Sequence, residues 1–126
     1  MRTARRLALV LLAAAGCAKG AGPPAAPPYD GPKAREALVA SLEAWKKGQT
    51  KGLARRKPPI RFEDDDVVTG LRLAEYEFEE PDAPVRLHQD VAVILSLRDP
   101  RGKVVRREAR YQVATVPGLA VIRTDD

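Results

Sequence analysis

From residue 67 onward, apolar and polar residues alternate with a period of two, and this alternation constrains the fold more than any other feature. Four segments of the chain carry it: 67–80, 86–98, 103–115 and the shorter 119–123. Alternation of this kind is typical of a β-strand with one buried and one exposed face. The phase slips by one residue near Ala74 and Glu75, which indicates a β-bulge in the first strand.

The third segment divides its residues most clearly between two faces. One face carries Val105, Ala109, Tyr111 and Val113. The other carries Arg106, Glu108, Arg110 and Gln112. Short turn sequences rich in Pro, Gly and Asp separate the segments, at residues 80–84, 99–102 and 117–118. Strands joined by short turns pair in sequence order, so we expect an antiparallel meander.

A helix is predicted before the strands, because apolar residues recur there at helical spacing. The stripe consists of Ala34, Leu38, Leu42 and Trp45. Asp30 can cap the N-terminus, Pro32 is tolerated in the first turn, and Gly48 suits the position after the end. On this stripe Trp45 is predicted to be a core residue rather than a stacking residue for a ligand. Residues 49–61 lack a period and are interpreted as a basic connection.

The fold class that follows is α+β: one N-terminal helix packed on a curved four-stranded antiparallel meander. The element order and the bulge resemble the cystatin-like and SnoaL-like folds, over residues 31–123. That resemblance implies a sheet curved around the helix, and it carries no functional residues. SnoaL-like enzymes usually have further helices that close a cone-shaped cavity, whereas here only one helix is clear.

The first 16 residues have the layout of a secretory signal peptide. Three arginines, Arg2, Arg5 and Arg6, precede an apolar run over residues 7–15. The run is roughly half of the about 20 residues that a membrane-spanning helix needs, so a signal peptide is the better interpretation.

The Ala14-Ala15-Gly16-Cys17 sequence resembles the lipobox of bacterial lipoproteins. In that family a diacylglycerol is attached to the cysteine thiol, and a peptidase cuts just before the cysteine. The resemblance implies lipidation of Cys17, the chain's only cysteine, and a membrane as the first partner. It also implies a cell-envelope location, and Ala18 favours the outer membrane where there is one. Stable anchoring by two or more acyl chains follows from the burial of their methylenes.

The predicted organisation is a signal peptide (1–16), a lipidated cysteine with a Pro/Ala/Gly-rich tether (17–29) and one domain (30–126). The chain has 22 Lys and Arg against 17 Asp and Glu. Three of the arginines lie in the predicted signal peptide, so cleavage lowers the net charge from +5 to +2. This balance is poor support for nucleic-acid binding, which needs a clustered basic face.

The basic segment between the predicted helix and the first predicted strand contains the first candidate site. Its cations are Lys51, Arg55, Arg56, Lys57 and Arg61. They could contact phosphate-bearing lipid or another anionic surface. The alternative is a solvated loop balanced by the acidic run that follows, over residues 63–66. That run lacks the spacing of a calcium loop, so we interpret it as an acidic turn that pairs with Arg55, Arg56 or Arg61.

His88 is the chain's only histidine, and Asp90 follows two residues later on the same face of the predicted strand. The two could form a base and its orienting carboxylate. We favour an exposed pair, because Gln89 rather than His88 is in phase with the predicted core residues Val91 and Val93.

The sequence shows no Ser/His/Asp set, no Gly-rich phosphate loop and no Cys/His metal spacing. It therefore predicts no catalytic residue, no metal and no cofactor. The expected function is a membrane-anchored, non-enzymatic binding or assembly module of the cell envelope, with an unknown envelope protein or ligand as second partner. The alternative is a small-ligand-binding or enzymatic cone-fold domain, which a concave pocket lined by polar groups would favour.

Overall fold

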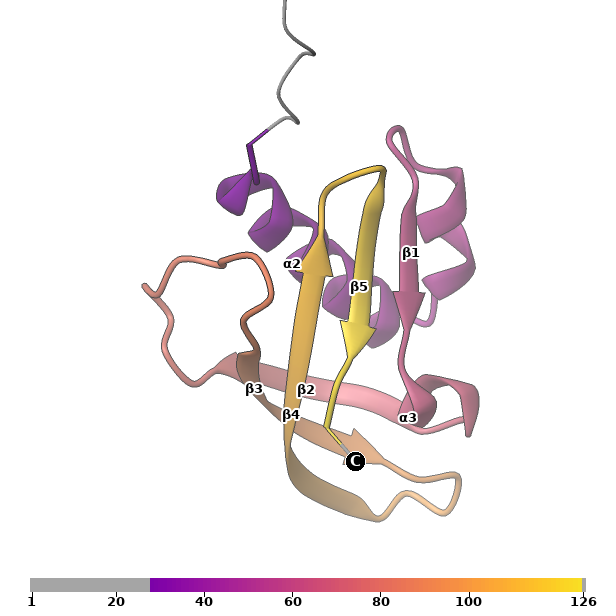
Figure 1. Ribbon diagram of the computed structural model, residues 1–126. Coiled ribbons are helices and arrows are strands. Elements are labelled where there is room, and N and C mark those ends of the chain that lie inside the picture. The colour runs from indigo at the N-terminus through magenta and orange to yellow at the C-terminus, as the bar shows by residue number, and fades with distance from the viewer. Residues whose placement is uncertain (1–27, 126) are drawn as a thin grey trace, which may run out of the picture.

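The computed structural model describes residues 28–125, and within them one helix packs against a curled five-stranded sheet (Figure 1). The predicted signal peptide, Cys17 and most of the predicted tether lie outside the described residues. The elements in chain order are α2 (Gly31–Lys46), η1 (Thr50–Arg55), β1 (Ile60–Glu63), α3 (Asp65–Val68), β2 (Arg72–Phe78), β3 (Val91–Arg98), β4 (Val104–Ala114) and β5 (Leu119–Arg123). In the described part of the chain, no helix has the length and apolar character that crossing a membrane requires.

The sheet is mixed, with strand order β1-β5-β4-β3-β2. Strands β2 to β5 form the predicted antiparallel meander, and the register between β2 and β3 shifts between Leu73 and Glu75, at the predicted bulge. β1 pairs in parallel with β5, from Ile60 opposite Leu119 to Glu63 opposite Ile122. The prediction of four antiparallel strands is therefore incomplete.

Three boundary predictions are wrong. The strand predicted over 86–98 begins only at Val91, as β3. The segment interpreted as a basic connection contains the 3₁₀ helix η1 and the start of β1. The predicted strand 67–80 begins later, because Val67 and Val68 belong to α3, whose N-terminus Asp64 caps by accepting a hydrogen bond from the Asp66 N–H. A strand of four residues is too short for alternation to distinguish it from a loop.

The predictions for α2 are confirmed in detail. Asp30 caps its N-terminus by accepting a hydrogen bond from the Lys33 N–H at 3.0 Å. Gly48 takes a φ of 69° just after the helix, a left-handed conformation that glycine adopts without strain. Trp45 is 5 % exposed, and its indole Nε1 donates to the Leu71 carbonyl at 2.9 Å. It is a core residue.

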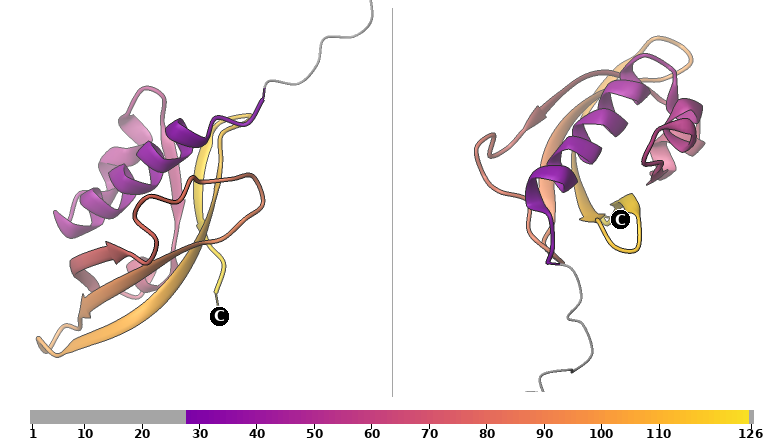
Figure 2. Two further views of the ribbon diagram at one scale, coloured as in Figure 1. Left: turned by 90° about the vertical axis from the view of Figure 1, so that its left-hand side faces the viewer. Right: turned by 90° about the horizontal axis from the view of Figure 1, so that it is seen from above.

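The core lies between α2 and the face of the sheet that α2 covers, which we call the concave face (Figure 2). Leu38 and Leu42 of the helix are fully buried, as are the three alternate residues Val93, Leu95 and Leu97 of β3. Phe62 of β1 contacts the rings of Trp45 and Tyr111, with centroids 6.2 and 6.3 Å away. The same phase on β4 and β5 carries Ala109, Tyr111, Val113 and Val121.

Candidate functional site

A cluster of charged side chains closes the concave face at the end where α3 lies (Figure 1). Arg123, at the end of β5, donates from Nη1 to Asp64 at 2.9 Å and to Asp66 at 2.8 Å. The Tyr111 hydroxyl donates to the second Asp64 oxygen at 2.5 Å. Arg107 donates to both Asp66 oxygens at 2.8 and 2.9 Å. The Asp64 side chain is fully buried and that of Arg123 is 9 % exposed.

The environment of the cluster fixes the protonation state of its central groups. Burial and the neighbouring Asp64 carboxylate raise the pKa of Tyr111, so its hydroxyl keeps its proton. Burial alone would lower the pKa of Arg123, but hydrogen bonds to Asp125 and Asp66 outweigh it and raise that pKa. Neither group exchanges a proton near neutral pH. This arrangement suits a structural cross-link rather than acid–base catalysis.

One of the ion pairs predicted for the acidic run is confirmed, but the partners predicted for Asp64 and Asp66 are wrong. Arg61 pairs with Glu63, as the sequence suggested. Asp64 and Asp66 bind Arg123 and Arg107 rather than Arg55 or Arg56. A signal existed in the sequence: Arg107 is in phase with Ala109 and Tyr111, and Arg123 with Val121, so both arginines lie on the concave face of the sheet.

The predicted His88 and Asp90 pair lies before β3 rather than on it. His88 is exposed and has a φ of 59°. Asp90 accepts hydrogen bonds from Gln112 Nε2 and Thr124 Oγ1, both at 3.0 Å, so its carboxylate is held by β4 and the C-terminal segment. In the described residues no hydrogen bond joins His88 to Asp90.

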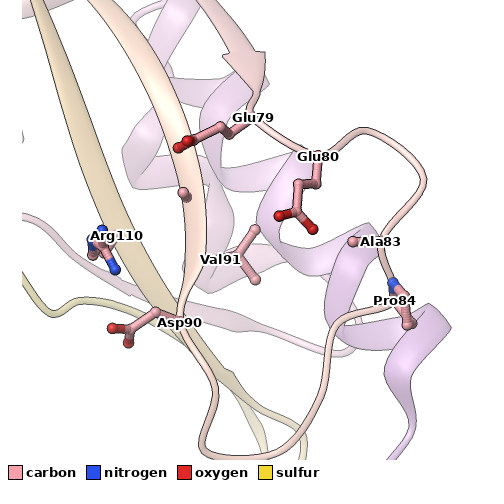
Figure 3. Close-up of a pocket in the computed structure, with 8 residues that line it drawn as sticks. Glu79, Glu80, Ala83, Pro84, Asp90, Val91 and Arg110 are labelled. Atoms are coloured by element: carbon pink, nitrogen blue, oxygen red, sulfur yellow. The ribbon is translucent and has the colours of Figure 1, made fainter.

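A pocket of about 260 Å³ lies beside this segment, between the β2–β3 connection and the start of β3 (Figure 3). Glu79, Glu80 and Asp90 contribute carboxylates to it, and Arg110 contributes a guanidinium. Across residues 28–125, no three His, Cys, Asp or Glu side chains are grouped so that they could hold a metal ion. Asp90 is engaged by its two partners, and His88 does not line the pocket. The predicted pair of His88 and Asp90 is therefore not assembled in this pocket.

The predicted basic segment lies mainly at one end of the domain, which we call the entry end. This end consists of the segment 28–30, the loop 56–59 before β1 and the β4–β5 turn at 115–118 (Figures 1 and 2). The Tyr29 hydroxyl donates to the Val113 carbonyl at 2.7 Å, which places the start of the described chain there. Arg56 and Lys57 share a hollow with Lys33 of α2, whereas Lys51 lies at the start of η1 and does not line this hollow.

A second group of cations, which the sequence did not single out, surrounds the β3–β4 turn at the opposite end (Figure 2). We call it the hairpin end. Its exposed members are Arg72, Arg98, Arg101, Lys103 and Arg106. Arg72 lies directly opposite Arg98 across β2 and β3. Among residues 28–125, no carboxylate lies within ion-pair distance of these five cations. Four of them are close in the sequence, within residues 98–106, a signal that we did not use, and strand pairing adds Arg72.

Models of known protein families, curated proteins and solved structures were compared with the chain, and none of them matches.

Proposed function

We propose that this protein is a lipoprotein of the cell envelope, held to a membrane by lipid on Cys17. Its domain is a non-enzymatic binding or assembly module. The anchor rests on the lipobox-like sequence that ends at Cys17. The module rests on the way in which the concave face is filled.

The filled concave face is the observation that carries the proposal. In a cone-fold enzyme or ligand carrier, this face would surround a cavity. Here Leu38 and Leu42 are fully buried against it, and Trp45 is nearly so. At the other end, Arg123 and Asp64 fill the space between the sheet and α3. In the described chain, the pockets lie instead at the edges of the sheet and on its outer surface. A pocket in such a position is open to a partner and does not enclose a substrate.

A cystatin-like architecture is part of the proposal. A helix followed by the bulged antiparallel strands β2 to β5 supports it. The parallel strand β1 is a departure, because it enters the sheet beside β5 from the segment that follows the helix. This departure creates a sheet edge next to the entry end.

The anchor is tested on protein extracted from membranes of a bacterial host that expresses the full chain. Mass spectrometry should find an N-terminal Cys17 carrying a diacylglycerol, and Cys17→Ser should abolish both the modification and cleavage before residue 17. A mature N-terminus at another residue with an unmodified cysteine would refute the anchor.

The module is tested by thermal unfolding in the presence of small apolar and amphipathic ligands. Trp45 is the chain's only tryptophan and packs in the core, so its fluorescence reports unfolding. A filled concave face predicts no change in Tm. A saturable rise in Tm with one ligand class would favour the cone-fold alternative, because a ligand that binds only the native state stabilises it.

A further inference from the structure

The entry end joins an exposed apolar surface to a group of cations. A shallow groove of about 650 Å³ runs over the outer face of the sheet beside the β4–β5 turn. Apart from Arg61, its lining has no charged side chain: Ala54, Pro59, Ile60, Ala114, Val116, Pro117, Gly118, Leu119, Ala120 and Ile122. Val116 is 52 % exposed. The contiguous apolar lining of the groove, rather than Val116 alone, is the feature that interaction surfaces share.

The cations border this groove through the loop before β1. Arg55, Arg56 and Lys57 are exposed, and none of them has an ion-pair partner among residues 28–125. Lys33 adds a fourth cation around the hollow that Arg56 and Lys57 line, where Glu36 is the one carboxylate. Arg61, on the groove itself, is paired with Glu63. The net charge of this surface is positive.

The outer face of the sheet changes character along β4. At the entry end, Ala114 lies opposite Ala120 of β5, and both line the groove. Toward the hairpin end, the same face of β4 carries Arg110, Glu108 and Arg106. Apolar surface and unpaired cations are therefore combined at the end where the described chain begins. Ten residues, 18–27, separate it from Cys17.

We propose that the entry end docks on an anionic lipid bilayer. Val116 and Pro117 enter the headgroup layer, and Arg55, Arg56 and Lys57 lie against lipid phosphates. This inference rests on the proposed lipid anchor, which holds the entry end near a bilayer. Charge complementarity favours an anionic surface, and each cation near it strengthens binding within about one Debye length. A docked domain presents its hairpin end away from the anchoring membrane.

The experiment uses the lipidated full-length protein with one reporter thiol. Cys17 is blocked by lipid, so Val116→Cys supplies the only free thiol for an environment-sensitive fluorophore. Val104→Cys, which replaces an equally exposed valine near the hairpin end, is the matched control. Each labelled protein is reconstituted into vesicles of phosphatidylcholine alone or with phosphatidylglycerol, and lipids with brominated acyl chains serve as quenchers. We expect quenching of the probe at position 116 in anionic vesicles, reduced by salt, and little at position 104.

Two variants that remove the same charge test whether docking depends on where the cations lie or only on the net charge. Arg56→Ala with Lys57→Ala should lower the ratio of docked to undocked domain roughly thirtyfold at low salt, since each cation contributes about fivefold. Arg101→Ala with Lys103→Ala removes the same charge at the hairpin end and should leave quenching unchanged. Equal losses from both pairs, equal quenching of both probes, or no quenching at position 116 would overturn the docking.

Flotation of the vesicles separates this inference from the anchor on which it rests. Protein that floats with both vesicle types and shows no quenching at position 116 keeps its anchor and refutes docking. Protein that floats only with anionic vesicles and is released by salt refutes the anchor. An unlipidated Cys17 would then also carry the fluorophore, so docking is judged in that case by flotation: loss in the variant with Arg56→Ala and Lys57→Ala but not in the variant with Arg101→Ala and Lys103→Ala supports it, and equal loss refutes it. Protein that floats with neither type of vesicle would refute both the anchor and the docking.

Discussion

The two halves of the concave face are closed in different ways. Under α2 the packing is apolar, and Leu38 and Leu42 meet the alternate residues of the sheet without exposed surface. Under α3 the space is filled by ionised side chains, with Arg123 between Asp64 and Asp66. The apolar half depends on a repeating pattern, because any well-sized apolar residue in phase contributes to it. The ionic half depends on a few partners that are distant in the sequence.

The size of α3 explains why the second half is ionic. With four residues, α3 has no room for an apolar stripe like that of α2. Its N-terminus needs a cap, and Asp64 supplies one while its other oxygen accepts from Tyr111. A buried carboxylate is costly unless it is paired, and Arg123 provides the counter-charge. The cluster thereby fixes α3, and the end of β1 before it, to β4 and β5.

Removing the cation of the ionic half should have the largest effect. Arg123→Met keeps most of the side-chain volume but leaves Asp64, Asp66 and Asp125 without this partner. We expect the free energy of unfolding to fall by about 3–5 kcal/mol, toward the upper end, because a buried charge is left uncompensated. Urea denaturation followed by Trp45 fluorescence measures the loss. Arg110→Met, which removes an exposed arginine of β4, is the control, and an equally small loss in both variants would contradict a buried ionic cross-link.

The apolar half should respond to a large-to-small substitution by the amount typical of a packed core. Leu42→Ala removes a fully buried side chain under the middle of the sheet, and we expect a loss of about 3 kcal/mol from transfer and cavity terms. Val68→Ala, at an 83 % exposed site on α3, should cost little and serves as the control. Denaturation in 1 M salt should give the same loss for Leu42→Ala, whereas a salt-dependent loss would mean that the two halves are not independent.

Deleting the hydrogen bond that joins the two halves should cost less stability than either substitution above. Tyr111→Phe preserves the ring contact with Phe62 and deletes only the hydroxyl that donates to Asp64. Because the acceptor is a buried carboxylate, we expect a loss of about 2 kcal/mol. Tyr29→Phe, which deletes a hydroxyl bonded to a backbone carbonyl at the entry end, is the matched control and should cost less. A loss near zero in Tyr111→Phe would show that the Tyr111 hydroxyl is dispensable.

The same contrast explains how much of the molecule its sequence predicts. Helix α2 with its flanking Asp30 and Gly48, strands β2 to β5 and the bulge follow from local periodicity and turn residues, so they were accessible. The parallel pairing of β1 with β5 was not, because it depends on a contact between segments about 60 residues apart. The ionic cluster was missed although Arg107 and Arg123 are in phase with core residues, because partner choice among many arginines and carboxylates needs the topology. Of the hairpin-end cations, four lie within residues 98–106 and were accessible from the sequence, whereas Arg72 joins them only through the pairing of β2 with β3.

The smallest effect should be a change in pH dependence at the edge of the ionic half. Burial alone would raise the pKa of Asp125, but hydrogen bonds from Arg123 and from the Arg110 N–H outweigh it and lower that pKa below its usual value. An acid whose pKa is lower in the folded state stabilises the fold above its unfolded pKa of about 3.9, and this contribution is lost as the pH falls through the folded pKa. Asp125→Asn should therefore lower the free energy of unfolding by a constant amount above about pH 5, and the difference from the parent protein should shrink as the pH falls below about 4.

Urea denaturation between pH 3 and 7 measures this difference, with Asp82→Asn in the exposed β2–β3 connection as the charge-matched control. A difference that stays the same across this range would show that Asp125 draws no ionisation-dependent stability from Arg123, and the ionic half would then end at Asp64 and Asp66.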